Sequence, residues 1–256
     1  MPNHDASVLI LTPMKSARRH LGSYFAALET LTYPHGLLSL GILEGDSTDG
    51  TFDEVGHCFA QHCSDFRRKT LFKRDFGFLM PEGVPRYADA YQAARRSILA
   101  RARNHLLFRA LRDEQWVLWL DVDVVEYPSD ILEQLLSFDK DILHPNCVID
   151  YGGESFDRNA WSAGGQKHLS DMRDQTIVRL EAVGGTMLLV RADRHRDGLV
   201  FPSFFYGARS RWVRDPHPLR GHHVGEIETE GLALMAKDMG IECWGLPRLE
   251  IRHCPE

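Results

Sequence analysis

Two aspartates one residue apart close an apolar run in WVLWLDVDVVEYP, residues 116–128. The run before them, residues 116–120, is apolar at both parities, which is typical of a central parallel strand covered on both faces. Ligands of open α/β sheets bind outside the carboxyl ends of the strands, so Asp121 and Asp123 lie where a ligand would meet them. In extended backbone the two carboxylates project to the same side, about 7 Å apart. Two acids so placed suit a hard divalent cation and the phosphates or ribose that accompany it.

The segments ahead of these aspartates alternate between strand-like and helix-like patterns, which predicts an α/β sheet. Residues 7–13, SVLILTP, form an apolar run that ends in proline, and residues 21–34 carry apolar positions at helical spacing. Residues 37–55 predict a second strand, a polar turn and then a helix. The turn sequence GDSTDGT is equally typical of an ordinary turn and of a loop that meets a ligand.

A helix is also predicted directly before the aspartate-bearing strand, over residues 94–113. Arg103 lies at the edge of its apolar stripe, and Asn104 faces away from it. The guanidinium of Arg103 either counters a diphosphate as a bidentate donor or belongs to a solvated helix face. The stripe itself consists of Leu99, Ala102, Leu106 and Ala110.

Composition excludes several classes of protein. With 256 residues and 43% hydrophobic content, the chain can bury a sizeable core as one domain. A net charge of −6 gives no basic field, so nucleic acid is not expected as the main partner. The absence of a leader-like segment and of an apolar window of about 18 residues predicts a cytoplasmic protein without a membrane span. The 5 cysteines are scattered without metal-ligand spacing and are expected as free thiols.

Several motifs, in order, carry a resemblance to a known family. LILTPMK, GILEGDSTDGTFDE and RARNHLLFRAL precede VLWLDVDVVEYP, and PSDILEQLLSFDKDILHPNCV, EAVGGTMLLVRADRHRDGLVFP and ETEGLALMAKDMGIECWGLPRLEIRH follow it. Together they resemble nucleotide-sugar glycosyltransferases of the GT-A fold. More specifically, they resemble the fungal mannan-polymerase α-1,6-mannosyltransferases, glycosyltransferase family 62, and their bacterial relatives. The resemblance covers roughly residues 7–253. The fungal proteins have a membrane anchor and a luminal stem that this sequence does not show, so their acceptor is not carried over.

The resemblance implies a fold and an activity. The fold is a single GT-A domain over residues 1–256, with a Rossmann-like mixed central sheet flanked by helices. Its nucleotide-binding half spans about residues 7–125 and its acceptor half about residues 126–256. The implied activity is metal-dependent, retaining transfer of a hexose, mannose from GDP-mannose, to a glycan or other hydroxyl acceptor. Mn²⁺, or Mg²⁺, is the implied metal, and assembly with further copies or related chains is implied as well.

The resemblance also assigns residues around the donor. Asp123 and His253 match the family's metal ligands, and Asp121 matches an acid that contacts the ribose or the water shell of the metal. Without the family, His253 would be taken for a surface histidine near the end of the chain. The positions expected around the nucleotide and its diphosphate are Thr12, Pro13, Glu44, Asp46, Arg103, Asp121 and Gly185.

Acids on the acceptor side are expected at the start of a helix within residues 222–240. Glu226, Glu228 and Glu230 crowd this helix start, where carboxylates are stabilised by the helix dipole whether or not they act in chemistry. Three glutamates on alternate positions predict that at least one of them has an acceptor-side or catalytic role, and Glu230 is favoured over Glu228. Asp123 is the expected catalytic residue on the donor side. The helix is expected to bury Leu232, Met235 and Met239 and to end at Gly240.

Three further segments are expected to form walls of the site. Residues 155–175 are polar and weakly periodic, which predicts a long loop or a mobile lid. The glycines at 184 and 185 either let the backbone approach a ligand or mark a bulge. Residues 204–223 are basic and aromatic, and an acceptor loop is favoured there over an RNA-binding surface.

Two other functions stay open. An inverting enzyme of the same fold would take its base from the glutamates at 226–230. A non-catalytic nucleotide-sugar-binding subunit is the alternative from another class, although Asp121, Asp123 and His253 are all retained. For retention, attack on the face of the leaving group is favoured, because spacing marks no single carboxylate as a nucleophile.

Overall fold

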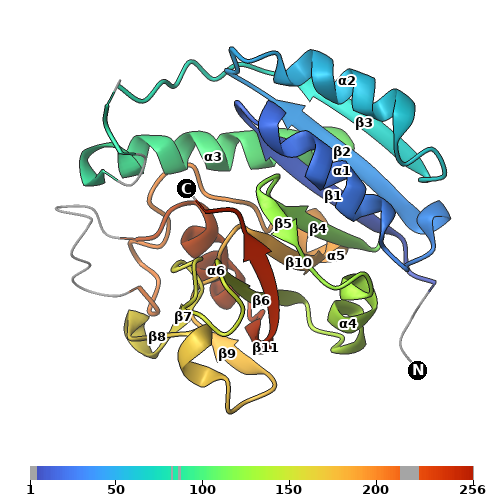
Figure 1. The fold of residues 1–256 in the computed structure, drawn as a ribbon. Coiled ribbons are helices and arrows are strands. Elements are labelled where there is room, and N and C mark those ends of the chain that lie inside the picture. Colours follow the sequence, from blue (N-terminus) through green and yellow to red (C-terminus); the bar gives the residue numbers. More distant parts are fainter. Residues whose placement is uncertain (1–4, 82, 86–87, 214–224, 256) are drawn as a thin grey trace.

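A single mixed sheet organises the molecule in the computed structural model, which describes residues 5–81, 83–85, 88–213 and 225–255. Eight strands follow the order β3-β2-β1-β4-β10-β6-β11-β5, and β9 pairs with β11 (Figure 1). The strands are β1 (Val8–Met14), β2 (Leu38–Glu44), β3 (Arg68–Lys73), β4 (Trp116–Leu120), β5 (Val124–Glu126), β6 (Ile142–Val148), β9 (Val178–Leu180), β10 (Met187–Arg191) and β11 (Cys243–His253). This arrangement confirms the predicted mixed α/β fold.

The first half of the sheet is parallel, and its inner strands β1, β2 and β4 are buried on both faces. β1 pairs with β2 and with β4, and β2 pairs with β3, all in parallel register. Every residue of β2 and of β4 is buried. This burial explains why both strands are apolar at odd and even positions.

The second half of the sheet mixes strand directions. β10 runs antiparallel to both β4 and β6, and β11 is parallel to β6 but antiparallel to β5. The pairing of β11 with β6 shifts register between Leu246 and Glu250. Beyond this irregularity β11 continues to its last residue, His253, which pairs with Val124 of β5. The end of β11 thus reaches the segment that carries the two aspartates.

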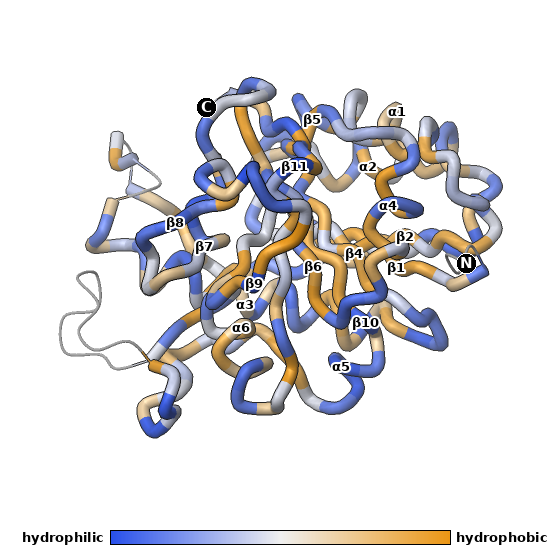
Figure 2. Tube along the Cα trace, turned by 90° about the horizontal axis from the view of Figure 1, so that it is seen from below, coloured by the Kyte–Doolittle hydropathy of each residue, from blue (hydrophilic) through white to orange (hydrophobic). Residues whose placement is uncertain are grey.

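Helices cover both faces of the sheet. The first core cluster contains Phe25 of α1, Val55 of α2 and Leu135 of α4, and the second contains Leu106 of α3 and Leu232 of α6. In Figure 2 the central strands are the most hydrophobic part of the trace. The helices are α1 (Leu21–Glu29), α2 (Thr51–Gln61), α3 (Asp89–Ala110), α4 (Ile131–Ser137), α5 (Ala192–Arg196) and α6 (Glu228–Asp238). None of the helices in the described part of the chain is long and apolar enough to cross a membrane.

Asn104, predicted to face away from the apolar stripe of α3, bonds to the backbone of Phe201: its amide donates to the Phe201 carbonyl at 2.7 Å and its oxygen accepts the Phe201 amide at 2.9 Å. Two local predictions were wrong. Met239 is not a core residue but is 39% exposed, because α6 ends one residue before it. Residues 155–175 are not an open lid. They contain the short strands β7 (Trp161–Ser162) and β8 (Lys167–His168) and two 3₁₀ turns, and their large apolar side chains Trp161, Leu169 and Met172 are buried.

The close packing of α3 on β2 can be tested at Gly41. A Cβ atom there would lie 2.8 Å from Leu11 Cδ2 and 3.0 Å from the Cβ of Ala110. We expect Gly41→Ala to lower the free energy of unfolding by about 1–3 kcal/mol through overpacking. The matched control is Gly56→Ala, on the exposed side of α2 with no atom within 4 Å, which should stabilise the protein by about 0.5–1 kcal/mol. Urea unfolding measures both, and equal effects would contradict this packing.

Candidate active site

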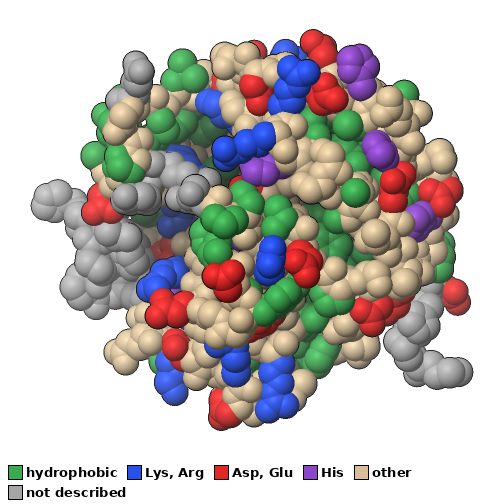
Figure 3. All heavy atoms as spheres, viewed as in Figure 1, with side chains coloured by type: hydrophobic (Ala, Val, Ile, Leu, Met, Phe, Trp, Pro, Cys, Tyr) green, Lys and Arg blue, Asp and Glu red, His purple; other side chains and the backbone are tan. Residues whose placement is uncertain are grey.

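Two connected cavities lie at the carboxyl ends of the parallel strands. The first, of about 520 Å³, is lined by Pro13 after β1, Asp46 after β2 and Asp123 after β4, and we call it the donor cavity. The second, of about 440 Å³, lies between α3, the start of β10 and the start of α6, and we call it the catalytic cavity. Asp121 and Arg103 line both cavities. On the face shown in Figure 3 the surface is hollowed, and Lys and Arg side chains gather around the recess.

The two aspartates of the opening motif do not lie in an extended strand. β4 ends at Leu120, and the amide of Val124 donates to the carbonyl of Asp121 at 3.3 Å, which closes a turn. The carboxylate of Asp121 contacts Arg103 at 3.2 Å, whereas that of Asp123 contacts His253 at 3.1 Å. The extended backbone on which the predicted 7 Å spacing depended is therefore absent, because the chain turns here to pass from β4 into β5, but both acids line the donor cavity. Each acid has its own partner.

Asp123 and His253 provide a donor set that fits a divalent metal ion. Asp123 Oδ1 and His253 Nε2 lie 3.1 Å apart. Two ligands held at about 2.1 Å and at right angles around one octahedral ion are also about 3 Å apart. One carboxylate with one imidazole suits Mn²⁺ when phosphate oxygens complete the shell. The described residues contain no group of three or more His, Cys, Asp or Glu side chains that could hold a metal ion. Asp121 therefore does not complete a three-residue site here.

The other side of the His253 ring is fixed in a way that suits a metal ligand. Its Nδ1 lies 2.7 Å from the carbonyl of Cys254, and its ring stacks on Phe156 with the centroids 4.0 Å apart. A histidine that donates from Nδ1 to a carbonyl presents the lone pair of Nε2 when neutral. Burial lowers the pKa of His253, but the hydrogen bond and charge of Asp123 outweigh it, so the pKa lies above its ordinary value. A cation that binds between Asp123 and His253 has to displace this proton.

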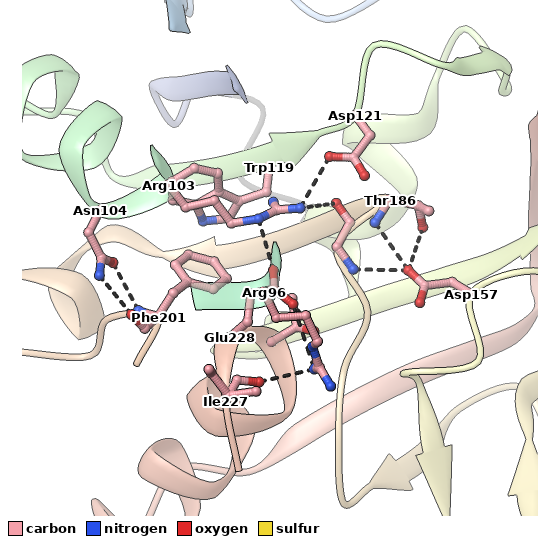
Figure 4. Close-up of polar contacts among 12 residues, drawn as sticks. Arg96, Arg103, Asn104, Trp119, Asp121, Asp157, Thr186, Phe201, Ile227 and Glu228 are labelled. Carbon is pink, nitrogen blue, oxygen red and sulfur yellow. Dashed lines mark hydrogen bonds and ion pairs between the residues drawn. The ribbon is translucent and has the colours of Figure 1, made fainter. Parts of the chain in front are cut away.

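Arg103 is the centre of the site and not part of a solvated helix face. Its side chain is only 4% exposed, and it lies between the rings of Trp119 and Phe201 (Figure 4). Its guanidinium contacts Asp121 at 3.2 Å and Glu228 at 3.1 Å. The Nη1 atom has no hydrogen-bond partner among the described residues. A buried guanidinium donor without a partner is suited to an anionic ligand.

The Asp121 carboxyl carries a strongly perturbed pKa. Burial raises the pKa of Asp121 to about 6, the charge of Asp123 adds to this effect, and Arg103 opposes it. A shift of this kind at the wall of a cavity is a common property of functional acids. The backbone of Asp121 is also fixed, because its amide donates to the Thr186 carbonyl at 2.9 Å.

The three glutamates at the start of α6, Glu226, Glu228 and Glu230, line the catalytic cavity. Glu230 is held at both oxygens, by Arg96 at 2.7 Å and by the indole of Trp161 at 3.0 Å. Glu228 accepts the Thr229 hydroxyl at 2.8 Å and faces Arg103. Its backbone has a φ of 59°, a left-handed conformation that a residue with a side chain adopts only when its surroundings require it. Glu228 and Glu230 are more than helix caps, since each is buried against an arginine.

The donor-side predictions divide into two groups. Pro13 and Asp46 line the donor cavity, and Asp46 also accepts the amides of Phe76 and Gly77 at 3.0 and 2.9 Å. Thr12 and Glu44 are fully buried and do not line it. The Thr12 hydroxyl is bonded to Tyr24 and to the Leu120 carbonyl, and Glu44 accepts the Ser47 amide at 3.1 Å. Both residues shape the cavity from behind instead of meeting a ligand.

Comparison with known proteins identifies the family. A sequence model described as Anp1 matches residues 2–177 and 163–205. The chain belongs to the Anp1 family. It is 32% identical over 292 residues to the mannan polymerase II complex anp1 subunit of Schizosaccharomyces pombe, covering 97% of this chain and 64% of that protein. It is 30% identical to the mannan polymerase complex subunit MNN9 of Candida albicans, covering 99% of this chain and 76% of that protein. The resemblance to mannan-polymerase subunits is thus confirmed.

Solved structures confirm the GT-A fold of this Anp1-family chain. One of them is the mannosyltransferase PcManGT from Pyrobaculum calidifontis, solved with GDP-Man and Mn²⁺. It superposes with a TM-score of 0.60 at 15% identity, and the superposition covers 100% of this chain and 60% of the PcManGT chain. S. aureus TarS residues 1–349 with UDP superposes with a TM-score of 0.56 at 12% identity, over 98% of this chain and 61% of its own. Because the sequence identities are this low, the two structures show only that the fold is shared.

The structure of the Anp1-family chain adds Asp157, which the sequence did not mark. Its Oδ2 accepts the Gly185 amide at 2.9 Å, the Thr186 amide at 3.2 Å and the Thr186 hydroxyl at 3.0 Å. His144 Nε2 lies 3.5 Å from the same oxygen. Gly185, expected near the donor, lines the catalytic cavity and has no room for a Cβ atom beside Arg103. The glycines at 184 and 185 therefore allow close packing of charged side chains.

Arg96 is the second residue that the sequence analysis missed. It precedes Arg103 by seven residues, two helical turns, so both arginines lie on one face of α3. Its guanidinium contacts Glu230 at 2.7 Å and Glu228 at 3.7 Å. The repeat of arginine at this spacing was the available signal. Of the predicted acceptor segment 204–223, residues 214–223 lie outside the described residues.

The role of Asp157 can be tested through the pH dependence of stability. Burial raises its pKa, but His144 and the amide and hydroxyl of Thr186 outweigh burial, and the pKa is held well below its ordinary value. A carboxylate whose pKa is depressed by folding stabilises the protein above its unfolded pKa of about 3.9, and this contribution is lost as the pH falls. We expect Asp157→Asn to lower the free energy of unfolding by about 2–3 kcal/mol at pH 7.

The difference between Asp157→Asn and the unchanged protein should shrink as the pH falls below about 4. Chemical unfolding from pH 7 to pH 3 measures it. Asp193→Asn is the matched control, because the Asp193 side chain is 72% exposed in a surface ion pair with Arg196. A difference that stays constant with pH would show that the charge of Asp157 contributes nothing.

Proposed function

We propose that this chain is a metal-dependent retaining glycosyltransferase that transfers a hexose, mannose from GDP-mannose, to a glycan or other hydroxyl acceptor. The observation that carries the proposal is the arrangement of Asp123, His253, Asp121 and Arg103 at the boundary of the two cavities. The mannan-polymerase relatives and the GDP-Man and Mn²⁺ of the archaeal structural neighbour support the choice of donor and metal.

Each residue of this arrangement has a different role in donor binding. Asp123 and His253 would hold Mn²⁺, or Mg²⁺, which neutralises charge on the departing nucleoside diphosphate when it is bound. Arg103 offers its unpartnered Nη1 to the same diphosphate, and its fixed position between two rings leaves little to reorganise during transfer. Asp121 keeps the guanidinium oriented and faces the ribose side of the donor cavity. The donor thus bridges the two cavities with its reacting bond beside Asp121.

The environment of the carboxylates supports attack on the face of the leaving group. Glu228, Glu230 and Asp157 line the catalytic cavity, and each is held by an arginine or by backbone donors. A carboxylate whose charge is already neutralised in this way is a weak nucleophile. The proton of the acceptor hydroxyl would then pass to the departing phosphate oxygen. Glu230 and Glu228 position the acceptor.

A second candidate is a nucleotide-sugar-binding subunit without turnover. It is favoured by the relatives, which are named as subunits of mannan polymerase complexes. The chain spans 64% of the length of the Schizosaccharomyces pombe subunit. Assembly with related chains belongs to both proposals. Donor binding without transfer to any acceptor would favour the second.

Donor binding is tested by thermal unfolding with GDP, UDP, GDP-mannose and UDP-glucose, each with and without Mn²⁺. A ligand at about 100 times its Kd stabilises the folded state by about 2.7 kcal/mol, which raises the melting temperature by roughly 5–10 °C in a domain of this size. We expect such a shift for guanine nucleotides with Mn²⁺, its loss on chelation, and its loss in Asp123→Ala. Asp113→Ala, in a surface pair where its side chain is 71% exposed, is the matched control. No shift with any nucleotide would refute the donor site.

The acceptor side is tested with Glu230→Gln. The amide keeps a hydrogen-bond acceptor for Trp161 but removes the charge that Arg96 neutralises. We expect transfer to fall by about tenfold or more, while the donor-induced melting shift is retained. Product analysis with GDP-mannose and a mannose oligosaccharide measures this, and the anomeric configuration of the product separates retention from inversion. Full activity in the variant would remove Glu230 from the acceptor site.

A further inference from the structure

A groove next to the catalytic cavity joins aromatic side chains to cationic ones. It has a volume of about 840 Å³ and lies between residues 204–212 and the end of α6. We call it the outer groove. Phe205 lines both the outer groove and the catalytic cavity. A chain-like molecule that lies in the outer groove can therefore reach the acceptor-side glutamates.

The wall of the outer groove is fixed to the rest of the fold. Tyr206 exchanges two backbone hydrogen bonds with Glu226, at 2.7 and 2.8 Å. Asp238 accepts the Tyr206 hydroxyl at 3.2 Å and the Ser210 hydroxyl at 2.8 Å. These bonds hold the loop on α6, and they direct both oxygens of Asp238 to neutral hydroxyl groups.

The cations of the outer groove form no ion pair with any acid of the described residues. Arg209, Arg211 and Lys237 line it, and no ion pair joins them to a carboxylate within the described part of the chain. Arg211 and Lys237 both lie over the indole of Trp212, at 4.4 and 4.2 Å from its centroid. In a protein with a net charge of −6, three cations beside Asp238, the one acid among the described residues that line the groove, make a local positive site.

The other arginine–indole contacts in the described residues show what is missing here. Each of those arginines also pairs with a carboxylate. The three sets are Arg103 over Trp119 with Asp121, Arg179 over Trp244 with Glu242, and Arg191 over Trp116 with Asp139. Arg211 over Trp212 lacks this third member. No carboxylate of the described residues takes the place beside Arg211 that an acid takes in the other three sets, and an anion from outside the protein can bind there.

We propose that the outer groove binds the non-reacting part of an anionic glycan acceptor. A carboxylate, phosphate or sulfate group of the glycan lies between Arg211 and Lys237, and a sugar ring packs on Phe204, whose side chain is 67% exposed. The concave shape favours a chain of sugar rings over the flat surface of a membrane. This inference rests on the proposed transfer to a hydroxyl acceptor and names the chemical class of that acceptor.

The test compares two tetrasaccharides with the same α-1,4 linkage, the acidic tetragalacturonate and the neutral maltotetraose. Calorimetric titration at low ionic strength should show that the protein binds the acidic one about tenfold more tightly, since two cations contact its charge. This preference should fall with added salt. It should disappear in the double variant Arg211→Ala/Lys237→Ala. The matched control is Lys140→Ala/Arg179→Ala, which removes the same pair of cations from Trp244 and should keep the preference.

Two further readouts separate this inference from the proposed function. The guanine-nucleotide melting shift should be unchanged in Arg211→Ala/Lys237→Ala, which also shows that the variant is folded. If guanine nucleotides do not raise the melting temperature of the unchanged protein, the donor site is refuted. The preference for the acidic saccharide is measured separately and still tests the outer groove. Equal affinity for both tetrasaccharides, or an acid preference that survives the double variant, would overturn the inference. So would binding to phosphatidylglycerol vesicles but to neither saccharide, because it would identify a membrane surface as the partner.

Discussion

The buried guanidinium of Arg103 is the interaction on which the site depends. A charge removed from water is tolerated in a protein only when carboxylates and hydrogen-bond acceptors surround it. Here the acids come from the end of β4 and the start of α6, and the carbonyl of Gly185 adds a contact at 3.4 Å. Three elements distant in sequence must therefore meet around one side chain of α3. The ion pairs fix the relative positions of the walls of both cavities.

A second constraint comes from the sheet itself. His253 and Asp123 are far apart in sequence, and they meet because β11 lies between β6 and β5 in the sheet. One edge of β11 pairs with β6 as far as Arg252, and the other edge pairs with β5 at Arg252 and His253. The amide of Cys254 then donates to the carbonyl of Asp123 at 2.9 Å, so backbone bonds hold the two side chains in register. Binding groups placed by a sheet are less mobile than groups placed by a free loop.

The sequence predicted the strands better than the contacts of single side chains. Apolar runs at both parities identified β1, β2 and β4, and the acids after β4 marked the ligand-binding edge. The family resemblance placed Thr12 and Glu44 around the nucleotide, but their side chains turn inward to Tyr24 and to the Ser47 amide. Asp157 lies in a polar segment with no periodicity, so nothing in its neighbours indicated that it would bind the Gly185 and Thr186 amides. Such contacts are set by packing between distant segments, which local patterns do not encode.

The place of β10 in the sheet has a consequence for folding during synthesis. β10 lies between β4 and β6 and runs against both, so the early strands β1 to β4 leave an open edge until residues 187–191 emerge from the ribosome. Domains fold largely in the order in which they are made, and an open strand edge is exposed to wrong pairing in the meantime. β11, which carries His253, arrives later still. The edge of the sheet that carries Asp123 thus forms before His253 reaches it, and the contact between Asp123 and His253 forms only after β11 has been made.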